Sequence, residues 1–110
     1  PVISTDKDVY HESSFKNLLG PKPSLKLLKR YSSELNVDNE TPHTFIVHSN
    51  DDKAVDVRNS LIFHEKLNEY NIINQMHIYG YGGHGYGIAV NKGILSMWPD
   101  LLYKWIIQLD

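Results

Sequence analysis

The feature that most constrains the fold of this chain is a strand–helix–strand–helix alternation in its second half. The segment HTFIVHS (43–49) is a compact β-branched and aromatic run, typical of a strand buried on both faces. Apolar residues recur at helical spacing in 57–70, NQMHIYG (74–80) predicts a second strand, and 99–110 predicts a final helix with an apolar stripe. This order is typical of a βαβ unit, which joins two parallel strands by a right-handed crossover.

The first half of the chain adds a short strand and a helical region to this unit. PVIS (1–4) predicts a short buried strand, and residues 24–35 have apolar side chains at near-helical spacing behind Ser24, a plausible N-cap. We therefore expect an α/β fold with about three parallel strands, flanking helices and a helical insertion at about 11–36. The arrangement should have two layers, or three with one incomplete, and residues 1–110 should form a single partial domain.

Composition and charge exclude several classes of function. Apolar residues make up 41% and charged residues 22% of the 110 residues, which is typical of a globular domain. The formal net charge is −2 and no basic stripe is present, so we expect no nucleic-acid partner. No apolar run approaches the roughly 20 residues needed to cross a bilayer. The chain has no cysteine, which excludes disulfides and thiolate chemistry, and we expect no cofactor.

Side chains capable of acid–base chemistry follow each of the two strands of the predicted βαβ unit. Asp51 and Asp52 come just after 43–49, and His84 comes just after 74–80. Loops that leave the carboxyl ends of adjacent parallel strands lie side by side, so a carboxylate and an imidazole should come within hydrogen-bonding reach. A carboxylate that accepts from one ring nitrogen leaves the other nitrogen free as a general base. These residues are therefore candidate catalytic residues, although an Asp-Asp pair alone is typical of a solvated turn.

The segment GYGGHGYG (80–87) holds five of the seven glycines, around His84. Glycines let the backbone turn sharply there and leave room for a substrate or a nucleophile beside the imidazole. GYGGHG (80–85) also matches the G-x-G-x-x-G fingerprint of dinucleotide sites, which requires a helix directly after the loop and then a strand with an acidic residue. Here IAVNKGILSMW intervenes before the final helix and no strand follows. We therefore reject a nucleotide site and predict a loop that presents His84 to a reaction.

The remaining polar motifs predict structure rather than chemistry. His43, His48 and His77 lie in or beside the predicted strands, where packed or half-exposed histidines are commoner than metal ligands. His64 and Glu65 lack the second histidine of an H-E-x-x-H motif, so we expect them on a solvated helix face. We predict no metal site.

Several stretches together resemble the C-terminal part of an α/β-hydrolase. They are TPHTFIVHSNDDKAVDVRNSLIFHEKLNEY (41–70), QMHIYGYGGHGYG (75–87) and a final helix that contains a tryptophan. The closest likeness is to the serine esterase branch that includes acetyl-xylan-esterase-like and dienelactone-hydrolase-like enzymes. The opening stretch (1–37) is similar to these proteins as well, so the resemblance covers essentially the whole chain and implies the C-terminal half of an α/β-hydrolase fold.

The resemblance implies a triad that runs serine, aspartate, histidine along the chain. It implies Asp52 as the acid, because family members place a valine three residues after that aspartate and Val55 stands there; Asp51 is the runner-up. It implies His84 as the general base. Members usually have a proline after that valine, where this chain has Asp56, which adds a negative charge close to the loop.

The nucleophile of such a triad is not in this sequence. The nucleophile elbow G-x-S-x-G occurs nowhere, and no HGGG-type oxyanion segment is present. The resemblance therefore implies the C-terminal segment of a serine ester hydrolase whose nucleophile-bearing N-terminal portion is absent here. The substrate of the whole enzyme would be a small ester or an acetylated carbohydrate such as xylan, and a secreted or periplasmic location is one that the resemblance allows. We expect the isolated chain to be inactive.

An alternative interpretation is a non-catalytic half-domain that acts as a self-associating or binding module. A strand without its neighbour leaves an open parallel edge and an uncovered apolar face. Such a chain should form homo-oligomers through the exposed edge of its sheet, or aggregate.

Overall fold

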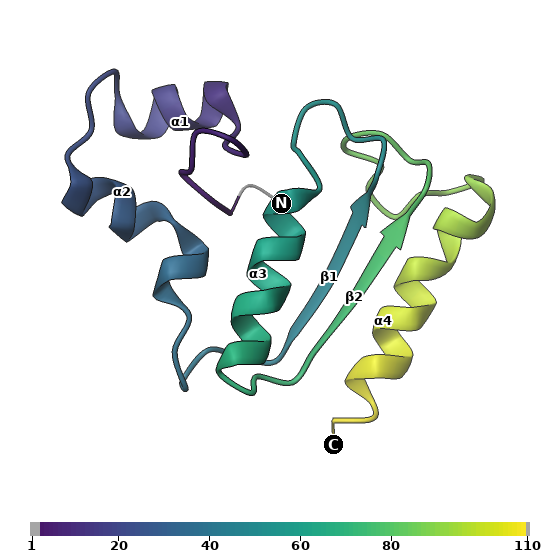
Figure 1. Cartoon of the computed structure of the whole chain (residues 1–110). Coiled ribbons are helices and arrows are strands. Elements are labelled where there is room, and N and C mark those ends of the chain that lie inside the picture. Colours follow the sequence, from purple (N-terminus) through teal and green to yellow (C-terminus); the bar gives the residue numbers. More distant parts are fainter. Residues whose placement is uncertain (1–2, 110) are drawn as a thin grey trace.

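The computed structural model describes residues 3–109, and its second half has the predicted alternation of strands and helices (Figure 1). The elements, in chain order, are α1 (Glu12–Leu19), α2 (Leu25–Tyr31), η1 (Ser33–Asn36), β1 (Thr44–Ser49), α3 (Arg58–Glu69), β2 (Asn74–Tyr79), η2 (Gly93–Met97) and α4 (Trp98–Ile106). The α/β class and the βαβ unit expected from the sequence are thus confirmed.

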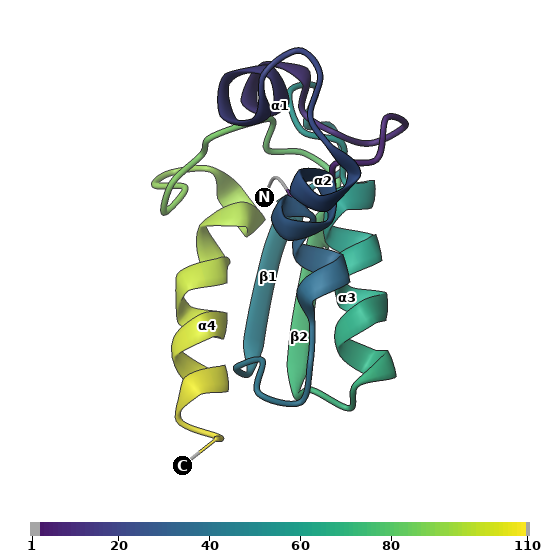
Figure 2. The same cartoon turned by 90° about the vertical axis from the view of Figure 1, so that its left-hand side faces the viewer.

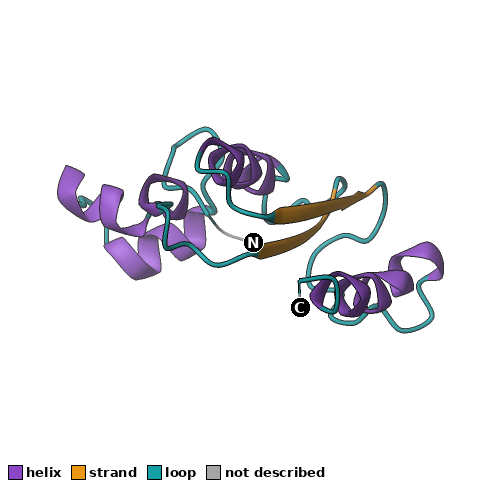
Figure 3. Ribbon diagram, turned by 90° about the horizontal axis from the view of Figure 1, so that it is seen from below, coloured by secondary structure: helices purple, strands orange, loops and turns teal. Residues whose placement is uncertain are grey.

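Within the described residues, the sheet consists of the parallel strands β1 and β2. They pair in register from Thr44 opposite Asn74 to Ser49 opposite Tyr79. α3 connects the strands and covers one face of the sheet, whereas α4 lies on the other face (Figures 1 and 2). The view from below shows α3 and α4 on the two sides of the strands (Figure 3). The architecture is therefore helix, sheet, helix, with a narrow middle layer.

Successive residues of β1 face the two helical layers. Ile46 is 4% exposed and packs with Val37 and with Leu67 of α3, which is completely buried. The adjacent Phe45 contacts the other layer, where its ring centroid lies 5.5 Å from that of Trp105 in α4. This is the pleat of a strand, in which neighbouring side chains point to opposite faces. The small core therefore lies mainly between the sheet and α3.

α4 covers its face of the sheet with only part of the predicted apolar stripe. Leu102 and Trp105 are half-buried, whereas Ile106 remains 48% exposed. Tyr103 and Ile107 are exposed as well. Apolar surface therefore stays open on this helix. Among residues 3–109, no helix has both the length and the apolar character that crossing a membrane requires.

The strand expected over 1–4 is not found in the part of that segment that the structure describes. The first two residues lie outside the described residues, and Ile3 and Ser4 are buried without belonging to a strand. Their backbone N–H groups both donate to Oδ1 of Asn59, at 3.1 and 3.0 Å. A side chain of α3 therefore satisfies the groups that a neighbouring strand would have bound, and the described residues form two strands instead of about three.

The helical insertion predicted at about 11–36 is confirmed as α1, α2 and η1, which lie beyond α3 on the side away from β2 (Figure 1). Ser24 caps α2, because its hydroxyl accepts a backbone N–H of the first turn at 3.2 Å. The helix expected over 24–35 ends earlier, at Tyr31. The side-chain amide of Asn36 donates to two carbonyl oxygens of the last turn of α2, at 2.8 and 3.3 Å, and so satisfies groups that the helix end leaves free.

Candidate active site

The acidic loop and the histidine loop, defined as residues 50–57 and 80–92, leave the sheet at the same end (Figure 1). The acidic loop follows β1 and the histidine loop follows β2, so the parallel pairing of the strands brings them together. A further backbone hydrogen bond, from Asn50 N to Tyr79 O at 2.7 Å, continues the pairing into the first residue of the acidic loop. The site is thus built at the carboxyl edge of the sheet, as predicted.

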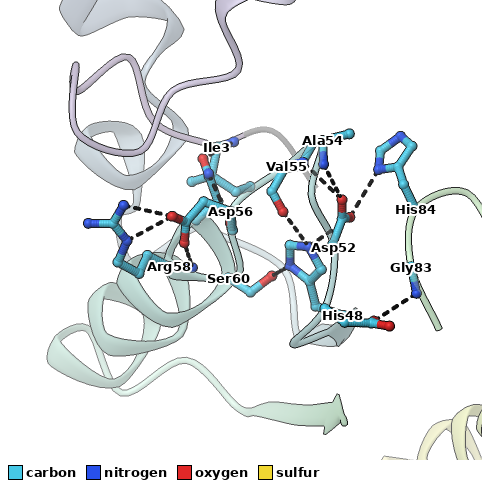
Figure 4. Close-up of polar contacts among 12 residues, drawn as sticks. Ile3, His48, Asp52, Ala54, Val55, Asp56, Arg58, Ser60, Gly83 and His84 are labelled. Carbon is cyan, nitrogen blue, oxygen red and sulfur yellow. Dashed lines mark hydrogen bonds and ion pairs between the residues drawn. The ribbon is translucent and has the colours of Figure 1, made fainter. Parts of the chain in front are cut away.

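Asp52 and His84 form a hydrogen bond across these loops. Oδ2 of Asp52 lies 2.9 Å from Nδ1 of His84 (Figure 4). A carboxylate can only accept, so Nδ1 carries the proton and the lone pair of a neutral ring resides on Nε2. The Asp52 side chain is 5% exposed and that of His84 is 58% exposed. Nε2 has no hydrogen-bond partner among residues 3–109, so the basic nitrogen is open to an incoming group.

The carboxylate of Asp52 is held as an anion by its own loop. Its Oδ1 accepts the backbone N–H groups of Ala54 and Val55, each at 2.9 Å. Burial acts to raise the pKa of Asp52, but the hydrogen bonds from Val55, His84 and Ala54 outweigh it and lower the pKa from 3.8 to about 2. Asp52 is therefore charged at neutral pH and presents a fixed negative oxygen to His84.

Asp51 makes a different connection between the same two loops. Its Oδ1 accepts the backbone N–H of Gly83 at 2.8 Å. Asp51 therefore binds the backbone next to His84, whereas Asp52 binds the imidazole itself. Of the two aspartates singled out in the sequence, the structure brings Asp52 to the ring.

Two structural requirements explain the glycines of the histidine loop: a close approach to neighbouring side chains and a positive φ. A Cβ on Gly82 would lie 2.1 Å from Oγ of Ser49 and 2.9 Å from Cδ2 of Leu95, so only glycine fits between them. Gly83 has φ +63° and Gly85 has φ +70°, a conformation that residues with side chains rarely adopt. The chain can therefore run over the end of β1 and turn sharply on both sides of the histidine. No helix opens directly after the fingerprint segment 80–85, since η2 begins only at Gly93.

Asp56, the departure from the family pattern, faces away from the Asp52–His84 pair. Its Oδ1 accepts the backbone N–H of Arg58 at 2.8 Å and its Oδ2 pairs with the Arg58 guanidinium at 2.6 Å (Figure 4). The guanidinium of Arg58 lowers the pKa of Asp56. Its charge is thus neutralised at the start of α3, where a negative group is also favourable to the helix.

His48 makes a contact with the Asp52–His84 pair that sequence reasoning missed. It was predicted as a packed strand histidine, and it is indeed buried, with 3% of the side chain exposed. Its ring also contacts Asp52 directly, because Nε2 lies 3.2 Å from Oδ2 of that residue (Figure 4). The signal was present in the sequence as a histidine four residues before the aspartate, at the end of a buried strand.

The described residues supply no nucleophile for His84. Ser49 is completely buried beneath Gly82, and Ser60 contacts His48 instead. Beside His84 lies an open hollow, which is lined by Val47 and by the aromatic side chains of Tyr86 and Trp98. Nε2 of His84 can therefore accept a proton from a hydroxyl that another segment supplies. Asp52 can stabilise the imidazolium that results.

Comparisons with known proteins agree on one group of hydrolases. The family model that matches residues 2–108 is the one described as the prolyl oligopeptidase family. Endo-1,4-beta-xylanase B from Butyrivibrio fibrisolvens is 35% identical over 104 residues, which is 94% of this chain and 16% of that protein.

Solved structures show the same likeness in three dimensions. The acetyl ester-xyloside bifunctional hydrolase from Caldicellulosiruptor lactoaceticus matches with a TM-score of 0.95 and 38% identity, over 99% of this chain and 40% of that one. A carboxylesterase from Lactobacillus plantarum matches with a TM-score of 0.75 and 19% identity, over 99% of this chain and 42% of that one, which is a likeness of fold. The chain thus spans well under half the length of these relatives.

Proposed function

This chain belongs to the prolyl oligopeptidase family and has part of the α/β-hydrolase fold, and from that premise we propose that it carries the acid and the general base of a serine hydrolase that cleaves carboxylic esters. Asp52 is the proposed acid and His84 the proposed base. The observation that carries the proposal is the 2.9 Å hydrogen bond between Oδ2 of Asp52 and Nδ1 of His84, with Nε2 of His84 left open at the carboxyl edge of the sheet.

In the proposed reaction, Nε2 of His84 takes the proton of a serine hydroxyl as that oxygen attacks the ester carbonyl. The charge of Asp52 stabilises the imidazolium that forms. His84 then returns the proton to the leaving alcohol, which leaves an acyl-enzyme. In the second half, His84 takes a proton from water as the water oxygen attacks the acyl carbonyl, and it returns that proton to the serine oxygen as the acid is released.

We place the serine in a segment outside these 110 residues, which together with residues 1–110 completes the domain. The sequence contains no G-x-S-x-G, and no hydroxyl of residues 3–109 is hydrogen-bonded to Nε2 of His84. The relatives are longer than this chain, which supports this division. The 110 residues alone should therefore release no acid from an ester above background.

The proposed substrate is an acetylated sugar or acetylated xylan. Support comes from two relatives above 30% identity, one described as an acetyl ester-xyloside bifunctional hydrolase and the other as an endo-1,4-beta-xylanase. The proposal commits to an ester rather than a peptide bond, although the family takes its name from an oligopeptidase.

The test is acetate release from acetylated xylo-oligosaccharides by the protein that joins this chain to the proposed serine segment. His84→Ala should reduce kcat/KM by about 10²- to 10⁴-fold, the usual contribution of a general base. His43→Ala is the matched control, since His43 is exposed and precedes the opposite end of β1. A prolyl peptide substrate serves as the competing arm. Unchanged acetate release by His84→Ala, or cleavage of the peptide alone, would overturn the proposal.

The second candidate, a self-associating module, has its own supporting observation. Within the described residues β1 pairs with β2 only, so one edge of β1 is open. Tyr103, Ile106 and Ile107 add exposed apolar surface on and just after α4, the helix that covers one face of the sheet (Figure 2). We propose homo-oligomers of the isolated chain through this open edge. Analytical ultracentrifugation should show concentration-dependent dimers or larger species, and a stable monomer at all concentrations would contradict this candidate.

A further inference from the structure

His48 joins three segments of the fold at the back of the Asp52–His84 pair. It lies in β1 and is buried, with its side chain 3% exposed. On one side of the ring, Nδ1 lies 2.7 Å from Oγ of Ser60 in α3. On the other side, Nε2 lies 3.2 Å from Oδ2 of Asp52 and 3.1 Å from the carbonyl oxygen of Val55 (Figure 4). Both ring nitrogens are therefore used.

These contacts select one protonation state of the ring. A carboxylate oxygen and a carbonyl oxygen can only accept, so Nε2 carries a hydrogen and shares it between Asp52 and Val55. Nδ1 can then accept the hydroxyl hydrogen of Ser60. Burial lowers the pKa of His48, which keeps the ring neutral although a carboxylate is next to it. A neutral ring with the hydrogen on Nε2 satisfies every contact.

The position of Asp52 Oδ2 depends on two imidazoles. Oδ1 is held by backbone N–H groups of its own loop, whereas Oδ2 has only His84 and His48 as hydrogen-bond partners among residues 3–109. His84 is 58% exposed and lies on a glycine-rich loop, so it is the less constrained of the two. The buried His48 is anchored in β1 and therefore limits the rotation of the carboxylate.

We propose that His48 is a positioning residue that, as a neutral hydrogen-bond donor, holds Asp52 Oδ2 toward His84; this inference rests on the proposed function of that pair. His48 does not touch the reacting atoms. It acts through Asp52 alone, and its link to Ser60 sets which nitrogen carries the hydrogen.

A purely structural role of His48 would depend on a different contact, the one with Ser60. In that case His48 would serve to attach β1 to α3 through Ser60, and its contact with Asp52 would be incidental. The two roles use opposite nitrogens of the ring, so side chains that replace only one nitrogen can separate them. A glutamine amide can reach the place of Nε2, and the shorter asparagine amide can reach the place of Nδ1.

The experiment compares His48→Gln with His48→Asn in the protein that joins this chain to the proposed serine segment. His48→Gln should keep kcat within about threefold, whereas His48→Asn should lower kcat about ten- to a hundredfold with little change in KM, the effect of losing one hydrogen bond to a charged group. His64→Asn and His64→Gln are the matched controls. His64 lies farther along α3 and hydrogen-bonds Asn74 of β2 and Asn68 of α3, and neither control should change kcat.

A second readout does not depend on activity. The Nδ1–H of His84, bound to a carboxylate, should give a far-downfield proton NMR signal that persists in His48→Gln and is lost or shifted upfield in His48→Asn. The ¹⁵N shifts of His48 in the unmodified protein should show a protonated Nε2 and an unprotonated Nδ1.

The outcomes separate the two proposals. If the unmodified protein hydrolyses no ester, the proposed function fails while the NMR signals still test His48. Equal or reversed effects of His48→Gln and His48→Asn overturn the positioning role. Finding the opposite tautomer of His48 in the unmodified protein would overturn the positioning role as well. That measurement does not depend on whether any variant folds.

Discussion

The carboxylate of Asp51 accepts the backbone N–H of Gly83 at 2.8 Å, one residue away from each member of the Asp52–His84 pair. The acidic loop and the histidine loop are therefore joined twice, once through a backbone group and once through a side chain. The first contact limits where the second can form, because His84 follows Gly83 directly.

Removing the Asp51 acceptor should loosen the histidine loop. Asp51→Ala should speed amide hydrogen exchange at Gly83 by about tenfold, as expected for one modest hydrogen bond, while Asp51→Asn keeps an acceptor oxygen and should leave exchange near its original rate. Exchange followed residue by residue by NMR measures this. Identical rates in both variants and in the unmodified chain would show that the contact does not restrain the loop.

Asp52 should contribute stability that disappears in acid. Its pKa in the folded protein, about 2, is below its ordinary value of 3.8, so the contribution is full well above 3.8 and is lost as the pH falls from there toward 2. The shift corresponds to about 2 kcal/mol. Urea unfolding at a series of pH values should show this loss in the unmodified chain and a flatter profile in Asp52→Asn. The exposed Asp100 gives the control Asp100→Asn, and an Asp52→Asn profile as steep as that control would refute the assignment.

A side chain at Gly82 should displace the histidine loop. The Cβ of Gly82→Ala would meet Oγ of Ser49 at 2.1 Å and Cδ2 of Leu95 at 2.9 Å. Ser49 is completely buried, so either the loop or these packed side chains must shift. We expect a loss of about 1–3 kcal/mol in the free energy of unfolding, the usual effect of overpacking. At Gly80 an added Cβ meets nothing within 4 Å, so Gly80→Ala is the matched control and should change stability by less than about 0.5 kcal/mol. Equal stability of the two variants would contradict the close approach.

Asn59 should be essential for holding the start of the chain against α3. It is completely buried, its Oδ1 accepts from Ile3 and Ser4, and its Nδ2 donates to the carbonyl oxygen of Val9 at 2.6 Å. Asn59→Ala leaves these backbone groups without partners, so unfolding should require about 3 kcal/mol less. Chemical denaturation measures the loss, and the exposed Asn39 provides the control Asn39→Ala. A loss no larger than that of the control would mean that other groups satisfy this backbone.

The sequence predicted β1, α3 and β2 closely, because their signals are local. A β-branched and aromatic run covers 44–49, and helical spacing covers 58–69, so each element forms where its own residues favour it. The segment 1–4 is also apolar, yet the two of its residues that are described form no strand. A strand requires a partner, and Asn59 binds those N–H groups instead. The early end of α2 at Tyr31 likewise depends on a contact, with Asn36.

The same distinction applies to the candidate site. The order of residues alone placed two aspartates and one glycine-flanked histidine at the carboxyl ends of two parallel strands, because parallel pairing makes those ends coincide. The spacing to Val55 favoured Asp52 only through a family resemblance and kept Asp51 as an alternative. The sequence did not predict that Asp51 binds the backbone of Gly83 or that His48 contacts Asp52. Those assignments depend on contacts between residues 32 positions apart and on burial around one carboxylate. Adjacent side chains in a loop point in different directions, and only the folded backbone sets which of them meets the histidine.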